Sequence, residues 1–368
     1  MNRVSRLIQL PLGLLLVLGL AACGSDPTGL GGTNFEPQQT AQATNTIKTQ
    51  LNSDDDVIAS LELVGPALDS AGVTSFVLPR NLANPREVIE GASAHVVQNF
   101  VLSGSSSDPI FPSNLLGKTF EWSDEFLRYV LNESLTGAPA NGVRFLLYPI
   151  DPVTRQPVSP AAGTDIGYLD LTDEGSASST RLGLVAVTSG VTRIDYYIDV
   201  SFTATENDIS VTLAGVGFVS DGTAAVDFNL SESVAFDLLG ESVSLDLLFS
   251  VAVPAEDVSV TLDMTIDVTG QEQLETASVV LTISDGDDTV VLDATLATDD
   301  SLDGTISYNG TVVVNVTGTG ENPVFTMADG TELTADDIGA LHDLVNLFDD
   351  LFDFAEHIFD PFDDSASF

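Results

Sequence analysis

The residue types that could carry chemistry are unevenly supplied in this chain of 368 residues, which has 55 acidic side chains, three histidines and one cysteine. Nucleophilic catalysis needs a base beside the nucleophile, and the candidate bases are His95, His342 and His357. None of them belongs to a zinc-binding His-Glu-x-x-His motif, and the sequence has no Gly-x-Ser-x-Gly nucleophile motif. We therefore predict that the chain is not an enzyme, and the alternative is a hydrolase that uses two carboxylates.

The carboxylates offer one candidate metal site. Asp285, Asp287 and Asp288 follow one another around a glycine, which places three carboxylates in a single turn. Because Ca²⁺ prefers several oxygen ligands, these three residues are predicted to bind calcium. The alternative is a turn that only joins two strands, since Asp is common in turns. No other cofactor is expected.

The single cysteine ends an apolar N-terminal segment. Arg3 and Arg6 precede the apolar residues 7–22, which end in Leu20-Ala21-Ala22-Cys23. This order of charge, apolar core, small residues and cysteine resembles the lipobox signal of bacterial lipoproteins; an ordinary secretory signal is the alternative. The resemblance implies that residues 1–22 are a removed signal peptide and that Cys23 carries the lipid anchor, palmitate included. Gly24, where Asp would mark inner-membrane retention, implies the outer membrane, on its periplasmic or surface face.

The net charge of −44 is concentrated in the second half of the chain. Residues 1–193 contain all 11 Lys and Arg, whereas residues 194–368 contain 36 acidic side chains and no Lys or Arg. This balance argues against nucleic-acid binding, which needs Lys and Arg to neutralise phosphates. The carboxylates of the second half must be solvated, hydrogen-bonded or bound to cations. The acidic bias also resembles that of salt-adapted proteins, which implies an environment and no activity.

Two segments precede the predicted sheet. Residues 23–45 are rich in Gly, Ser, Thr, Pro and Gln, which predicts the lipid-bearing residue and a flexible tether. Residues 46–118 are predicted to be helical and mixed, because apolar residues in 46–75 recur at helical spacing.

Residues 119–330 alternate between apolar and polar side chains, which is typical of half-buried strands. Short turn sequences such as Asn309-Gly310 separate these strands. Short connections make consecutive strands antiparallel neighbours, so this region is predicted to form a meander. Its apolar face would lie inside a curved sheet, a half-barrel or a sandwich.

Residues 331–368 return to helical spacing and end in an acidic tail. Thr334 is predicted to cap the helix, with Asp337 three residues later, and Pro361 to follow its end. The apolar stripe of this amphipathic helix is predicted to cover the sheet, and a helix lying on a membrane is the alternative. The expected fold is therefore mainly β, with a short helical N-terminal part, and residues 46–368 form one folded unit.

Three functions are compatible with these features. We predict a lipid-anchored cell-envelope protein that acts as a non-catalytic structural or binding module, with the membrane and an envelope protein as partners. The first alternative is a periplasmic carrier of an apolar ligand or lipid, similar in outline to the half-barrels of lipoprotein carriers. The second is an integral outer-membrane β-barrel, which the terminal Phe368 favours and the low aromatic content of 7% opposes.

Overall fold

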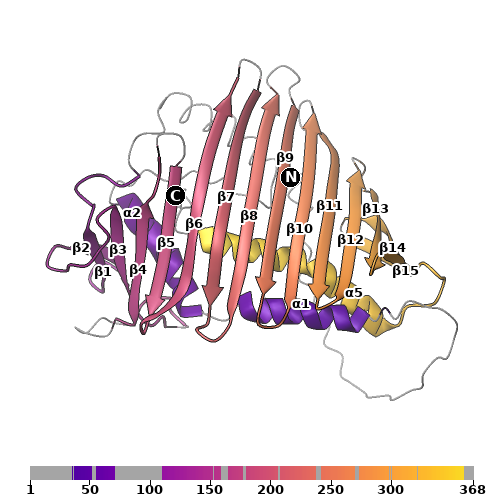
Figure 1. Cartoon of the computed structure of the whole chain (residues 1–368), viewed down its shortest axis with the longest axis horizontal. Coiled ribbons are helices and arrows are strands. Elements are labelled where there is room, and N and C mark those ends of the chain that lie inside the picture. Colours follow the sequence, from indigo (N-terminus) through magenta and orange to yellow (C-terminus); the bar gives the residue numbers. More distant parts are fainter. Residues whose placement is uncertain are drawn as a thin grey trace.

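The computed structural model describes residues 35, 37–51, 55–70, 110–151, 153–158, 165–176, 180–205, 208–237, 242–269, 273–297, 299, 301–320 and 322–359. Cys23, the signal segment and His95 lie outside these residues. The described part is mainly β, as predicted, and consists of one open sheet of 15 strands and three helices (Figure 1). The helices are α1 (Pro37–Leu51), α2 (Asp55–Ser70) and α5 (Ala335–Phe359).

The strands of the sheet are β1 (Lys118–Ser123), β2 (Arg128–Asn132), β3 (Gly142–Leu147), β4 (Gly167–Asp173), β5 (Thr180–Thr188), β6 (Val191–Ala204), β7 (Asp208–Ser220), β8 (Ala225–Asp237), β9 (Ser242–Val253), β10 (Val258–Thr269), β11 (Gln273–Asp285), β12 (Asp288–Ala297), β13 (Ser301–Tyr308), β14 (Thr311–Thr319) and β15 (Asn322–Met327). From β3 to β15 each strand pairs with the next in antiparallel fashion, which confirms the predicted meander. The Asn309-Gly310 turn has φ values of 49° and 77°, the left-handed geometry that this pair favours.

The meander is broken at one end of the sheet. Strand β1 lies between β2 and β3, and it runs parallel to β3. The predicted antiparallel meander therefore holds for the sheet as a whole, and this edge adds one parallel pair. The parallel pairing is available because β2 and the segment that follows it return the chain to the same end of the sheet.

The sheet tapers towards both edges (Figure 1). The edge strands β2 and β15 have five and six residues, whereas β6 has 14. Short edge strands leave few backbone groups for pairing with another chain, and Pro323 in β15 has no N–H at all. The sheet is not closed, because β2 and β15 pair with β1 and β14 and not with each other.

The helix α1 begins inside the segment that was predicted to be a tether. The prediction of 23–45 as flexible is wrong from Pro37 onward, because residues 37–51 form this helix. Although α1 is mostly polar in composition, one of its faces is buried. The residues of this buried stripe recur at helical spacing and are Thr40, Ala43, Thr44 and Ile47. The Thr44 hydroxyl donates to the Thr40 carbonyl over 3.0 Å, so its burial leaves no unpaired hydroxyl.

The C-terminal helix begins at the predicted cap. The Thr334 hydroxyl accepts from the Asp337 amide at 3.2 Å, and an Asp337 carboxylate oxygen accepts from the Thr334 amide at 2.9 Å. This reciprocal pair satisfies two backbone donors at the start of α5. The helix runs across the strands next to α1, and the Lys48–Asp350 ion pair of 2.6 Å joins the two helices (Figure 1).

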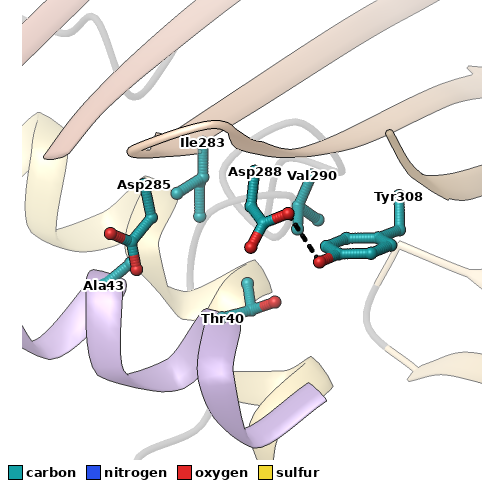
Figure 2. Close-up of a pocket in the computed structure, with 7 residues that line it drawn as sticks. All are labelled: Thr40, Ala43, Ile283, Asp285, Asp288, Val290 and Tyr308. Atoms are coloured by element: carbon teal, nitrogen blue, oxygen red, sulfur yellow. Dashed lines mark hydrogen bonds between the residues drawn. The ribbon is translucent and has the colours of Figure 1, made fainter. Parts of the chain in front are cut away.

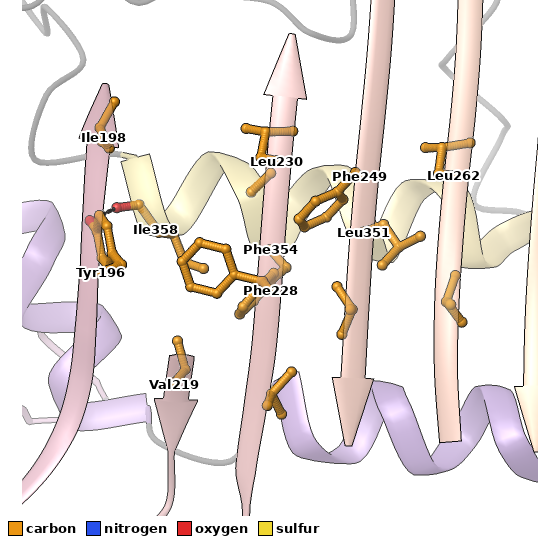
Figure 3. Packing of buried hydrophobic residues seen from close by; sticks show 14 of the residues in the cluster. Tyr196, Ile198, Val219, Phe228, Leu230, Phe249, Leu262, Leu351, Phe354 and Ile358 are labelled. Atoms are coloured by element: carbon orange, nitrogen blue, oxygen red, sulfur yellow. Dashed lines mark hydrogen bonds between the residues drawn. The ribbon is translucent and has the colours of Figure 1, made fainter. Parts of the chain in front are cut away.

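The helices cover one face of the sheet. Phe354 of α5 lies over the sheet, with ring centroids 6.0 Å from Phe228 and 6.4 Å from Phe249 (Figure 3). The Tyr196 hydroxyl donates to the Ile358 carbonyl near the end of α5. We call this side of the sheet the covered face, and the opposite side the open face. The predicted cover of the apolar face by the C-terminal helix is confirmed.

Candidate functional site

The turn between β11 and β12 carries the predicted calcium ligands. Asp285 and Asp288 are direct register partners across this hairpin, and Gly286 between them has a φ of 58°. Both carboxylate side chains are half-buried, whereas Asp287 is exposed. The Tyr308 hydroxyl and the Asn309 side-chain amide donate to the same Asp288 oxygen, over 2.7 and 2.9 Å.

Asp285 and Asp288 line a small cavity beneath α1 (Figure 2). The cavity has a volume of about 20 Å³, enough for one water molecule. Its lining residues are Thr40, Ala43, Ile283, Asp285, Asp288, Val290 and Tyr308. The structure thus brings two of the three predicted ligands to one cavity, and Asp287 is not among its lining residues.

Two other features of this turn bear on the calcium prediction. Thr40, which lines the same cavity, lies in the first turn of α1, where the positive end of a helix dipole favours nearby negative charge. Among the described residues, no group of three or more His, Cys, Asp or Glu side chains is arranged to hold a metal ion. Calcium binding at Asp285, Asp287 and Asp288 therefore stays a prediction, and the strand-ending turn accounts for the hydrogen bonds that are present.

The open face between β3 and β6 carries ion pairs that the sequence did not reveal. Arg144 on β3 binds Asp170 on β4 through two hydrogen bonds of 2.6 and 2.7 Å. Its guanidinium lies 3.7 Å from the centroid of the Tyr168 ring. The hydrogen bond to Asp170 raises the pKa of Arg144 above its ordinary value. Both partners occupy polar strand positions, and only the cross-strand register shows that they face each other.

A second set repeats the arrangement two strands further along. Arg181 on β5 donates to Asp199 on β6 over 2.6 Å and lies 4.3 Å from the Tyr197 ring centroid. Each set combines a charge-assisted hydrogen bond with a cation–π contact. With their charges and rings paired to one another, these side chains form a structural brace of the sheet.

The open face between β8 and β13 is rich in Ser, Thr and Asp and has no basic residue. Asp246 on β9 accepts a hydrogen bond of 2.9 Å from the Thr265 hydroxyl on β10. The exposed aspartates of this part are Asp227, Asp246, Asp263, Asp293 and Asp303. No Lys or Arg follows Arg193, so the strands from β8 to β13 supply hydroxyls and no basic side chain as partners for these carboxylates.

One acidic residue among the described side chains is fully buried on the covered face. Glu232 on β8 is 2% exposed, and within the described part of the chain neither of its carboxylate oxygens has a hydrogen-bond partner. The burial of Glu232 was not predicted from the sequence, although the alternation along β8 indicates it. Val226, Phe228 and Leu230 alternate on the covered face, and the next two positions of that alternation are Glu232 and Val234.

The remaining sequence candidates do not form a site in the described residues. His342 is exposed on α5, with its ring 5.3 Å from that of Phe325. The side chain of His357 is not among those described, and neither Cys23 nor His95 is in the described residues. His342 is therefore the one histidine whose side chain is placed among the described residues.

Comparisons with known proteins give no further guide, because no family model, curated protein or solved structure matches this chain.

Proposed function

We propose that this chain is a lipid-anchored cell-envelope protein that acts as a non-catalytic structural or binding module through the open face of its sheet. The observation that carries the proposal is the division between the two faces. All three described helices belong to the core on the covered face. The open face presents exposed polar side chains across the strands from β8 to β13. A broad and strongly acidic face that none of the described helices covers suits binding at the surface rather than enclosure of a substrate.

The membrane attachment rests on the sequence. The lipobox-like Leu20-Ala21-Ala22-Cys23 supplies the acceptor for a lipid whose chains contribute about 0.8 kcal/mol for each buried CH₂ group. Among the helices in the described part, none combines the length and the apolar character needed to cross a bilayer.

The alternatives have less support from the described residues. A carrier needs an interior volume of several hundred Å³, whereas the cavity beneath α1 has about 20 Å³. A hydrolase needs two carboxylates that converge in a cleft, and Glu232 is the one acidic residue buried among the described side chains. A barrel needs its end strands to pair, and β2 and β15 do not.

The anchor is tested with Cys23→Ser, which removes the thiol that the lipid would occupy. We expect the variant to leave the membrane fraction and to lose incorporation of labelled palmitate. Ser25→Ala, two residues beyond the anchor, serves as the control and should behave as the wild type. Unchanged fractionation and labelling of Cys23→Ser would refute the proposed anchor.

The choice between module and carrier is tested by native mass spectrometry of the protein extracted from membranes. A module should show the mass of the acylated chain alone, because its covered face is packed with its own side chains. A stoichiometric apolar molecule that dissociates on activation would establish the carrier instead. The measurement depends on the interior of the sheet and not on the anchor, so the two proposals fail separately.

A further inference from the structure

We propose that Glu232 is a proton-sensitive group in the apolar layer on the covered face of the sheet: the layer is stable while this carboxyl is protonated, and its ionisation loosens the layer. This device is independent of what the open face binds. It gives an envelope protein, which is exposed to external pH, a stability that depends on that pH.

The surroundings of Glu232 are apolar on every described side. Its register partners are Leu213 on β7 and Leu247 on β9, which are 5% and 2% exposed. Along β8, Leu230 and Val234 occupy the neighbouring positions of the same face and are also buried. In the view of Figure 3, α5 crosses β8 near Leu230, and Glu232 is the next covered-face position along the strand. A charge at this place would therefore be enclosed by hydrocarbon.

No described charged group faces Glu232 from the elements around it. The inward side chains of β7 and β9 beside it are leucines, and Asp246 and Asp227 point to the open face. On the helices, Lys48 of α1 is paired with Asp350 of α5. The other described titratable residues of α5, which are exposed or lie at its capped start, are Asp336, Asp337, His342 and Asp343. The side chains of Asp349, Asp353, Glu356 and His357 lie outside the described ones.

Among the described residues, burial is the cause that shifts the pKa of this carboxyl. Desolvation raises the pKa of Glu232 from its ordinary value of 4.5 to about 7. The folded state keeps the proton where the unfolded state has lost it. The contribution of Glu232 to stability is thus constant below pH 4.5, falls as the pH rises from 4.5 to about 7, and is constant again above that.

The test is the melting temperature of the whole protein between pH 4.5 and 8.5, for the wild type and for Glu232→Leu. Leucine fills a similar volume and cannot ionise. We expect the wild type to lose roughly 5 °C or more relative to Glu232→Leu across this range. Asp246→Asn, which removes a carboxylate from the opposite face of the neighbouring strand, should keep the wild-type slope. Identical slopes for all three proteins would overturn the proposal.

Two further measurements keep the test decisive. Glu232→Gln should also have a flat curve, at a lower melting temperature because its amide stays unpaired. Amide hydrogen exchange of the wild type, corrected for the intrinsic effect of pH, should show less protection in β8 and α5 at pH 8 than at pH 6. Should both variants fail to fold, unchanged protection in β8 and α5 would by itself refute the loosening of the layer.

Discussion

Glu232 and Asp246 lie on the neighbouring strands β8 and β9, and they face opposite sides of the sheet. Asp246 is exposed and accepts a hydrogen bond from Thr265, whereas Glu232 is buried among leucines and has no hydrogen-bond partner among the described residues. The same functional group is therefore solvated on one face and desolvated on the other. The alternation of side chains along a strand determines which face a carboxylate occupies, and that face determines whether its charge is solvated or destabilises the fold.

The open face itself is built in two ways. From β3 to β6, Arg144 and Arg181 pair with carboxylates of the next strand and lie over tyrosine rings. From β8 to β13 the chain has no Lys or Arg, and hydroxyls and water replace the guanidinium groups. Both parts belong to one sheet with one continuous core, so the composition of an open face is free to vary while the covered face is not.

The largest expected effect comes from the covered face. Phe354→Ala should lower the free energy of unfolding by about 3–5 kcal/mol, because it removes the contacts with Phe228 and Phe249 and leaves a cavity under α5. Leu248→Ala on the open face, where the side chain is 44% exposed, should cost less than about 1 kcal/mol. Urea denaturation measures both. Equal losses would show that the two faces contribute alike.

Two glycines, one in the sheet and one on α5, are predicted to respond oppositely to substitution by alanine. At Gly217, which lies between Tyr196 and Phe228 in the register, an added Cβ would come within 2.2 Å of the Asp195 carbonyl oxygen. Gly217→Ala should therefore cost about 1–3 kcal/mol through a forced backbone shift. Gly339→Ala on α5 meets no atom within 4 Å and should stabilise the helix by up to about 1 kcal/mol. Opposite signs in urea denaturation are the expected result.

The features that depend on local pattern could be predicted from the sequence. The alternation from β6 to β14 predicted the meander, and Thr334 with Asp337 predicted the start of α5. Both signals lie within a few residues of the structure they specify, because strand pleat and helix caps are local geometry.

The features that depend on contacts between distant segments could not be predicted in this way. The parallel pairing of β1 with β3, and the contact of Arg144 with Asp170, follow from the register of the sheet. The buried stripe of α1 was hidden by threonines, whose burial is tolerated only where a backbone acceptor such as the Thr40 carbonyl is near. Glu232 interrupts an apolar alternation, but its energetic cost depends on how deeply the folded protein buries it.

The next prediction concerns Arg144, in the part of the open face between β3 and β6 that contains arginines. Arg144→Met should cost about 1–2 kcal/mol, because it removes the two hydrogen bonds to Asp170 and the contact with Tyr168 in a half-buried place. The loss should shrink at high salt, which screens the charges of the wild-type pair. A double-mutant cycle with Asp170→Asn measures the coupling. A coupling of zero would mean that the brace contributes nothing.

Calcium binding is expected to have a smaller effect, confined to the turn between β11 and β12. If the predicted site binds with millimolar affinity, 10 mM CaCl₂ should stabilise the protein by about 1 kcal/mol beyond NaCl of equal ionic strength. Asp288→Asn should remove this increment, while its side-chain oxygen still accepts from Tyr308. An increment of zero in the wild type would leave the turn as a strand connection stabilised by α1.

The smallest effect is expected for a single carboxylate of the acidic part. Asp263→Asn on β10 should change the melting temperature by less than about 2 °C, and in the stabilising direction, because it removes one charge from a face without basic residues. Raising NaCl from 0.05 to 0.5 M should raise the wild-type melting temperature and reduce this difference, since screening weakens the same repulsion. Salt would then act oppositely on the two parts, strengthening the acidic part and weakening the Arg144–Asp170 pair. Destabilisation by Asp263→Asn would instead show that this carboxylate has an attractive partner. The acidic part would then be stabilised by paired carboxylates, as the part between β3 and β6 is.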